Sequence, residues 1–311
     1  MNSSPVQYPS FGFHRLAKSP FFRILLVASA LAGLLGCGQK EESQEDENEE
    51  GHALLGVVQA VNPETLEMTV AHEEIPDFMP PMTMVFRVGL GDVKVFKKGD
   101  QIRARMVRDE DGGFRLIKIW KIDDESAEVM RRVNKRLAKQ VDDLGSGYYL
   151  AEGDAFPEFA LLDQYGETVT PTRYKGKPFV LNFIFTRCTD GEMCPLSTSK
   201  MARLQKMAAE EGLQDLEFVS VTLDPKYDTP GVLRAYADGY GIDGSNFRFV
   251  TGEKEMVRRL IKSMAVTHIE DEDDIIHSLA TVLVGRDREI VKRSTKKAWD
   301  PEAFLEAARV L

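Results

Sequence analysis

The stretch "PFVLNFIFTRCTDGEMCPLST" (residues 178–198) decides the fold of the second half of the chain. Its first eight residues are nearly all apolar, which is typical of a strand buried on both faces of a sheet. Cys188 and Cys194 follow the strand, and Pro195 suits the first turn of a helix. The free N–H groups and the dipole at a helix N-terminus stabilise thiolates. The pattern therefore predicts a buried strand, a loop with two thiols, and a helix that begins near the second thiol.

Further strands and helices alternate after this stretch. The runs "LEFVSVTL" (216–223) and "LATVLVG" (279–285) also have the composition of buried strands. Helical stretches are expected near residues 196–211, 230–240, 253–264 and 300–310. The order predicts helices around a mixed sheet. A cysteine pair at the C-terminal end of a central strand is typical of a thioredoxin-like α/β domain.

The spacing of the two cysteines leaves two interpretations open. A redox thioredoxin has two residues between its cysteines, whereas five residues separate Cys188 from Cys194. The wider loop is compatible with a structural disulfide, and it also allows both sulfurs to converge on a metal ion. A purely structural disulfide has no reason to lie at the end of the central strand, so we favour a functional thiol pair.

A metal site needs further ligands, and His277 is the best candidate. It lies just before the strand "LATVLV", in the region where thioredoxin folds place a residue that faces the cysteines. His268 is a competitor, but it opens the acidic loop "IEDEDD" and is expected to be exposed. Two thiolates and one imidazole form a soft ligand set that favours copper, with zinc as the main rival.

Residues 154–311 resemble the Sco/SenC family of copper chaperones, thioredoxin-like proteins that help load the copper site of cytochrome c oxidase. The segments "NFIFTRCTDGEMCPLST", "SVTLDPKYDTP" and "IIHSLATVLVGRDREIV" carry the resemblance. It implies that Cys188, Cys194 and His277 bind copper and that a Cys188–Cys194 disulfide is the oxidised, metal-free form. Asp224 matches a family carboxylate near the site and is not expected to be a ligand. The five-residue spacing matches a wider-spaced variant of the family.

The first half of the chain has a different pattern. From residue 53 to 122, short runs alternate between apolar and polar residues, and turn signals separate them. Five such strands predict a small all-β barrel of the OB type. An amphipathic helix follows over residues 125–144, with Val129, Val133, Leu137 and Val141 on one stripe that packs on a neighbouring domain, and "GSG" (145–147) ends it.

Within the barrel, "HEEIPDFMPPMTMVF" (residues 72–86) gathers Met79, Met82 and Met84 near His72. A strand places Met82 and Met84 on one face. These two thioethers and the imidazole of His72 are a neutral, soft ligand set that prefers Cu(I) and Ag(I). Alternatively, Met82 and Met84 fill the barrel core, as methionine often does.

The same segment resembles the CusF-like periplasmic copper- and silver-binding domain, a five-stranded OB-type barrel. The shared pattern is His72, then Pro81-Met82-Thr83-Met84 and Phe86. The resemblance implies that His72, Met82 and Met84 bind the metal. In that family a tryptophan three residues before the first methionine covers the ion through a cation–π contact. Met79 takes that position here, which makes it a candidate third sulfur ligand.

The N-terminus indicates export. Residues 1–40 contain no Asp or Glu, and three basic residues precede the apolar run "ILLVASALAGLLG" (24–36). The run is too short to span a bilayer comfortably but suits a signal peptide. "LLGC" resembles a bacterial lipobox, which implies lipidation of Cys37; an uncleaved signal anchor is the alternative.

We therefore expect an exported copper metallochaperone, lipid-anchored on the periplasmic side of a bacterial membrane, rather than an enzyme. The expected parts are a signal peptide (1–36), an acidic tether (37–51), a CusF-like barrel (52–122), a helical linker (123–147) and a Sco/SenC domain (148–311). The partner would be a membrane copper enzyme such as a cytochrome c oxidase subunit. A thiol–disulfide reductase that maintains partner cysteines and a copper-resistance buffer are the alternatives. The formal net charge of -10 argues against a nucleic-acid partner.

Overall fold

The computed structural model describes residues 51–143, 148–270 and 275–311. The predicted signal peptide, the predicted lipidation site Cys37 and residues 37–50 of the predicted acidic tether lie outside the described residues, as do Leu144 and "GSG" (145–147). In the parts of the chain that are described, no helix combines the length and the apolar character that a membrane span requires.

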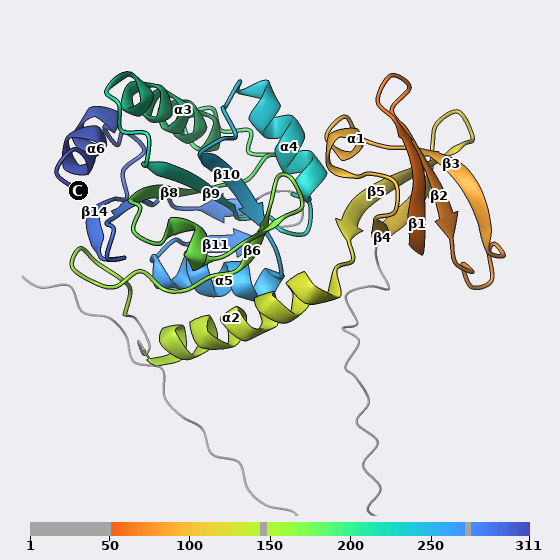
Figure 1. The fold of residues 1–311 in the computed structure, drawn as a ribbon, viewed down its shortest axis with the longest axis horizontal. Helices are drawn as coiled ribbons and strands as arrows, with labels where there is room; N and C mark the ends of the chain where they lie inside the picture. The colour runs from red at the N-terminus through yellow and green to blue at the C-terminus, as the bar shows by residue number, and fades with distance from the viewer. Residues whose placement is uncertain (1–50, 144–147, 271–274) are drawn as a thin grey trace, which may run out of the picture. The chain divides into compact units, whose positions relative to one another are not determined.

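The N-terminal region is a closed five-stranded β-barrel, as predicted (Figure 1). Neighbouring strands follow the order β1-β2-β3-β5-β4 around the barrel. Alternate residues of β2 are buried, because successive side chains of a strand point to opposite faces. The barrel core includes Leu54, Val70, Phe86 and Met106, and each is nearly inaccessible to solvent. The strands and the short helix between β3 and β4 are β1 (His52–Asn62), β2 (Glu67–His72), β3 (Met82–Arg87), α1 (Asp92–Val95), β4 (Gln101–Arg108) and β5 (Phe114–Lys121).

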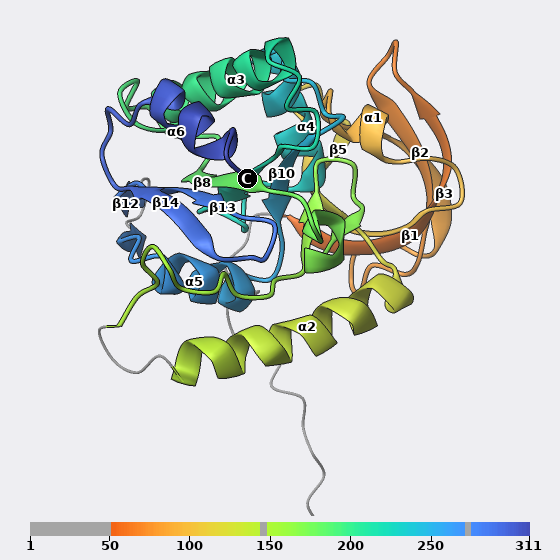
Figure 2. The same ribbon diagram turned by 60° about the vertical axis from the view of Figure 1, so that its left-hand side comes forward.

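The predicted amphipathic helix is α2 (Asp124–Asp143). Leu137 and Val141 of its apolar stripe are buried in the core of the C-terminal domain, whereas Val129 and Val133 are partly exposed. The helix packs along α5, as both ribbon views show (Figures 1 and 2). The prediction that this helix packs on a neighbouring domain is confirmed.

The C-terminal domain contains a seven-stranded sheet with the order β14-β13-β8-β9-β10-β6-β7. Strands β8, β9 and β10 are parallel, and the outer pairings are antiparallel. Every residue of β8 and of β9 is buried, which explains their continuous apolar sequence. The strands of this sheet are β6 (Leu161–Asp163), β7 (Thr168–Val169), β8 (Phe179–Ile184), β9 (Glu217–Thr222), β10 (Phe247–Thr251), β13 (Thr281–Val284) and β14 (Ile290–Ser294).

Helices cover both faces of this sheet (Figures 1 and 2). α3, α4 and α6 lie on one face, and α5 lies on the other together with α2. A separate two-stranded hairpin pairs β11 with β12. The remaining elements are the 3-10 helix η2 (Pro171–Tyr174), α3 (Cys194–Glu210), α4 (Pro230–Gly239), α5 (Lys254–Ser263), α6 (Pro301–Ala308), β11 (His268–Glu270) and β12 (Ile275–His277).

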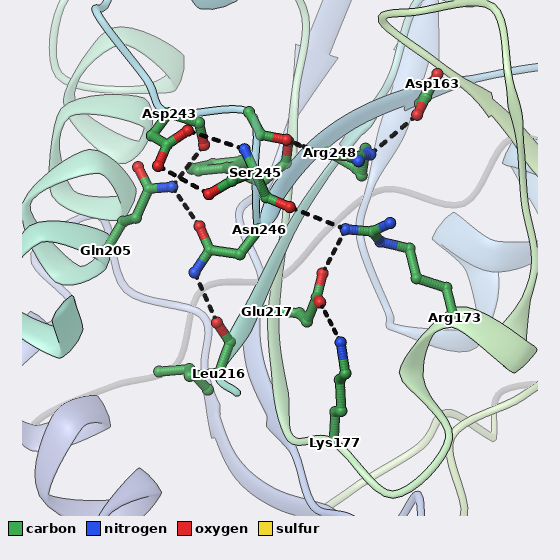
Figure 3. A network of polar contacts seen from close by, with 12 residues as sticks. Asp163, Arg173, Lys177, Gln205, Leu216, Glu217, Asp243, Ser245, Asn246 and Arg248 are labelled. Atoms are coloured by element: carbon green, nitrogen blue, oxygen red, sulfur yellow. Dashed lines mark hydrogen bonds and ion pairs between the residues drawn. The ribbon is translucent and has the colours of Figure 1, made fainter. Parts of the chain in front are cut away.

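A polar network holds one edge of the sheet together (Figure 3). The buried carboxylate of Glu217 pairs with Arg173 and Lys177, each at 2.8 Å. Glu217 begins β9 and lies opposite Phe179, the first residue of β8. The network therefore lies at the N-terminal edge of the parallel strands, whereas the two cysteines follow the C-terminal end of β8. We assign it a structural role.

Candidate metal centre

The sheet topology brings His277 to the two cysteines. Strand β13 runs antiparallel to β8, and Thr281 at its start pairs with Asn182 near the end of β8. His277 precedes β13 by only a few residues, so it lies at the edge of the sheet where β8 ends and the cysteine loop begins. Residues more than eighty positions apart in the sequence therefore meet, as the sequence analysis expected.

The side chains of Cys188, Cys194 and His277 converge. One ligand atom of each lies within 4.8 Å of the other two, and the Sγ of Cys194 is 3.4 Å from the Nε2 of His277. Cys194 is fully buried, whereas Cys188 is partly exposed. Both cysteines are free thiols in this structure. The predicted disulfide of the oxidised form stays a prediction.

Cys188 and His277 line one pocket, whereas the fully buried Cys194 does not. Phe185, at the end of the buried strand, packs its ring edge-on to the imidazole of His277 at 5.4 Å. The lining of the pocket therefore contains both apolar and polar residues. Its lining residues are Phe185, Cys188, Thr189, Asp190, Met193, Ile275, Ile276 and His277.

A hydrogen bond orients the imidazole of His277 for metal binding. Its Nδ1 lies 3.0 Å from the carbonyl oxygen of Ser278, and a carbonyl can only accept a hydrogen bond. The ring proton therefore belongs on Nδ1, which leaves the lone pair of Nε2 directed at the thiols. Orientation of a histidine ligand by such a contact to its other nitrogen is the common arrangement in metal sites.

The two thiols differ in acidity. A hydrogen bond from Cys194 lowers the pKa of the Cys188 thiol to about 5, and burial opposes this shift only in part. The same hydrogen bond, together with burial, raises the pKa of Cys194. Cys188 is therefore the more acidic of the two thiols.

Two aspartates lie beside the cysteine loop and have different partners. Asp224 pairs with Arg187 at 2.6 Å, and the guanidinium of Arg187 also stacks on Tyr227. Asp228 is fully buried and accepts hydrogen bonds from the N–H and the hydroxyl of Thr186 and from the hydroxyl of Thr222. Asp228 therefore joins the ends of β8 and β9 directly beneath the cysteine loop, a role that the sequence analysis missed.

The prediction for His268 was wrong in one respect. We expected an exposed side chain, but His268 is half-buried, and its Nε2 is buried without a hydrogen-bond partner. The reason is the hairpin: His268 in β11 lies directly opposite His277 in β12. Among the described residues, the group of three close ligand atoms contains His277 and not His268.

The barrel places its predicted ligands on one face. His72 pairs with Met82, and Val70 pairs with Met84, so these four side chains share the face of the sheet that lines the barrel interior. Met82 is 44% exposed, which excludes it as core filler, whereas Met84 is partly buried against the core. Met82 and His72 therefore lie at one end of the barrel.

His72 has the features of a metal ligand. Its side chain is buried, and its Nδ1 lies 2.7 Å from the carbonyl oxygen of Glu73, so the ring proton belongs on Nδ1. The Nε2 is buried and has no hydrogen-bond partner. A buried polar atom without a partner is costly unless something else satisfies it. A soft metal ion held with Met82 and Met84 would do so.

Met79 lies in the loop between β2 and β3. Its backbone N–H and carbonyl oxygen both bond to Ile75, at 3.0 and 2.8 Å. Its half-buried side chain packs against the barrel core. Whether this thioether also reaches a bound ion stays a prediction.

Comparison with known proteins agrees with this geometry. Residues 150–311 match the family model SCO1/SenC, which covers more than half of the chain. The chain belongs to the SCO1/SenC family. Residues 51–121 match a second model, that of the copper binding periplasmic protein CusF. The predicted fold, a thioredoxin-like α/β domain preceded by an OB-type barrel, is confirmed, and so is copper as the metal of these families.

Individual relatives match the C-terminal part of the chain. The SCO1 protein homolog of Bacillus subtilis is 33% identical over 138 residues, which are 43% of this chain and 70% of that protein. A SCO1/SenC family lipoprotein from Bacillus anthracis is 30% identical, covering 51% of this chain and 95% of that one, with a TM-score of 0.47. BsSco, described as a member of the Sco family of cytochrome c oxidase assembly proteins, is 27% identical over 51% of this chain and 95% of that one, with a TM-score of 0.44.

Proposed function

We propose that this chain is an exported copper chaperone. Its barrel takes up Cu(I) at His72, Met82 and Met84, and its thioredoxin-like domain holds Cu(I) at Cys188, Cys194 and His277. The chaperone then delivers the ion to a membrane copper enzyme such as a cytochrome c oxidase subunit. Delivery requires ligand exchange, and a site with few ligands at an open pocket suits this exchange.

The convergence of two sulfurs and one imidazole nitrogen within 4.8 Å carries the proposal. Thiolates and imidazole favour copper over hard cations such as magnesium or calcium. A structural zinc site would need a fourth protein ligand in a closed shell. Among the described residues, three His, Cys, Asp or Glu side chains bring their ligand atoms together at this site. Asp224 was the acidic residue expected near the site, and its carboxylate pairs with Arg187 instead.

The ligand set of the barrel supports uptake in an oxidising compartment. Thioethers carry no proton and form no disulfide, so the barrel site stays competent where thiols oxidise. The cysteine site, by contrast, binds copper only when both thiols are reduced. The two sites therefore differ in redox sensitivity and share a preference for Cu(I).

A transfer assay tests delivery. The chain from residue 49 onward, loaded with Cu(I) without oxygen, is mixed with the soluble copper-binding domain of a cytochrome c oxidase subunit, and the copper in each protein is measured after separation. We expect copper in the acceptor, and we expect transfer to fall to background for Cys188→Ser/Cys194→Ser. Copper that stays on the chain would favour the alternative of a copper-resistance buffer.

The acidity of the thiols favours a second candidate function, thiol–disulfide reduction of a partner. The partly exposed Cys188 has the lowered pKa of a nucleophile, and the buried Cys194 has the position of a resolving thiol. In that case metal-free, reduced protein would reduce an oxidised acceptor domain, and Cys194→Ser would trap a mixed disulfide through Cys188. Absence of both results would exclude this function.

We also propose that a lipid on Cys37 holds the chain at the periplasmic side of a bacterial membrane. The pattern "LLGC" at residues 34–37 supports the anchor, and the match to a periplasmic copper-binding family supports the compartment. Incorporation of radiolabelled palmitate, and its loss in Cys37→Ser, tests the anchor.

A further inference from the structure

Met193 lies at the copper site without being one of its expected ligands. It directly precedes Cys194 and lines the same pocket as Cys188 and His277. Its side chain is only 9% exposed. Yet it does not belong to the hydrophobic core cluster of the C-terminal domain, which does contain Met201 and Met256. Met193 is therefore buried at the pocket rather than in the core.

The backbone of Met193 is held on both sides. Its N–H donates to the carbonyl oxygen of Asp190 at 3.0 Å, and its carbonyl oxygen accepts from the N–H of Ser197 at 2.9 Å. The first bond closes the loop between the cysteines, and the second begins helix α3. These bonds fix the Cα of Met193 at the pocket, while its unbranched side chain keeps the freedom to place the sulfur.

We propose that the thioether of Met193 is a fourth ligand to the copper ion held by Cys188, Cys194 and His277. This inference rests on the proposed copper-chaperone function and adds a ligand to its site. A thioether is a soft, neutral donor, so it adds a bond to Cu(I) without adding charge. It also makes the site less favourable for Cu(II), which prefers nitrogen and oxygen donors. The ion would then stay monovalent during transfer from the His72, Met82 and Met84 site.

The alternative is that Met193 only shields the ion from water. Both roles bury the side chain, so burial cannot separate them, but only a ligand brings the sulfur within bonding distance of copper. Substitution of selenium for sulfur gives a direct readout, because a copper–selenium vector is distinguishable from copper–sulfur in X-ray absorption. Met193 is the single methionine among the described residues that line the pocket.

The test uses selenomethionine-labelled protein from residue 49 onward with Met79→Leu/Met82→Leu/Met84→Leu. These substitutions remove the three methionines expected to bind copper in the barrel and leave Met68 and Met106 buried in its core. One equivalent of Cu(I) is added without oxygen, and absorption is measured at the copper and selenium edges. We expect one selenium scatterer per copper beside the two thiolate sulfurs and one imidazole. Met193→Leu should abolish the selenium scatterer and keep the thiolates. Met201→Leu, in the adjoining helix α3 but in the core, should keep it.

The outcomes separate this inference from the proposed function. Copper bound by two sulfurs and one nitrogen, with no selenium scatterer in the parent variant, overturns the role of Met193 and leaves the chaperone function standing. That result needs no substitution at Met193, so a folding defect of Met193→Leu cannot obscure it. Failure of the cysteine site to bind Cu(I) at all overturns both.

Discussion

The Nε2 of His277 lies 3.4 Å from the Sγ of Cys194, although the two residues are 83 positions apart in the sequence. The antiparallel pairing of β13 with β8 creates this contact. His277→Gln should therefore lower the Cu(I) affinity of the cysteine site by at least about 100-fold, since even residues that only orient a ligand change affinity roughly 10- to 100-fold. Competition with a Cu(I) chelator measures the affinity.

His268→Gln is the matched control for that substitution. His268 lies opposite His277 in the same hairpin, but it does not belong to the group of three residues whose ligand atoms converge. We expect the affinity of His268→Gln to stay within about threefold of wild type, the usual scatter of context effects. Equal losses in both variants would argue that the hairpin fold, and not the imidazole of His277, holds the copper.

The acidity of Cys188 gives a prediction about pH. Because the hydrogen bond from Cys194 lowers the pKa of Cys188 to about 5, Cys188 is a thiolate above that pH and becomes a thiol as the pH falls through it. The rate of alkylation by iodoacetamide in the metal-free, reduced protein should level off above about pH 6 and reach half its plateau near pH 5. Peptide mapping should find the label on Cys188 first, because Cys194 is buried and its pKa is raised.

Cys194→Ala tests the cause of that acidity. Removal of the donor thiol should move the midpoint for Cys188 upward, toward the ordinary thiol value near 9. A midpoint that stays near 5 would mean that something other than Cys194, such as His277 or the helix N-terminus, sets the acidity of Cys188.

Asp228 provides a prediction about stability. Asp228→Ala leaves the N–H and hydroxyl of the half-buried Thr186 and the buried hydroxyl of Thr222 without their acceptor. The free energy of unfolding should therefore fall by roughly 2 to 4 kcal/mol. Burial raises the pKa of Asp228 to about 6. The unfolded chain therefore ionises this carboxyl first, and wild-type stability falls as the pH rises from about 4 to about 6. The difference between wild type and variant should be largest at the acidic end of this range.

Asp224→Ala is the control for Asp228. Asp224 is buried, but its partner Arg187 is 49% exposed, and its carboxylate also accepts a hydrogen bond from the N–H of Tyr227. With a half-exposed partner and fewer donors than Asp228, Asp224→Ala should cost about 1 kcal/mol. Chemical denaturation of both variants gives the comparison. If Asp224→Ala were as destabilising as Asp228→Ala, the network around Thr186 would not be what holds the ends of β8 and β9.

The elements that could be predicted from the sequence are those with strong local patterns. The continuous apolar runs became β8, β9 and β13, and the alternating runs became the five barrel strands. β6, β7, β11 and β12 were not predicted, because strands of two or three residues have too little periodicity, and their partners decide where they form. β10 and β14, each of five residues, were also missed.

At the metal site, too, local sequence patterns predicted some residues, whereas others depend on contacts in the folded chain. Cys188, Cys194 and His277 were recognisable because their residue types are rare and their positions at strand ends are informative. The half-buried position of His268 follows from its cross-strand pairing with His277, and local composition gives no sign of it. Asp228 reaches the loop after β8 only through its hydrogen bonds to Thr186 and Thr222 in the folded chain. Met193 is next to Cys194 in the sequence, but its burial at the pocket depends on the backbone bonds that close the cysteine loop and begin α3.

A titration with Cu(I) tests most directly the claim that one chain carries two copper sites of different chemistry. The chain from residue 49 onward is titrated under reducing, oxygen-free conditions, and bound copper is measured against a competing chelator. We predict two equivalents for wild type, one for Met82→Leu/Met84→Leu and one for Cys188→Ser/Cys194→Ser. If Met82→Leu/Met84→Leu binds two equivalents with unchanged affinity, the barrel is not a copper site, and the account of two cooperating sites is wrong.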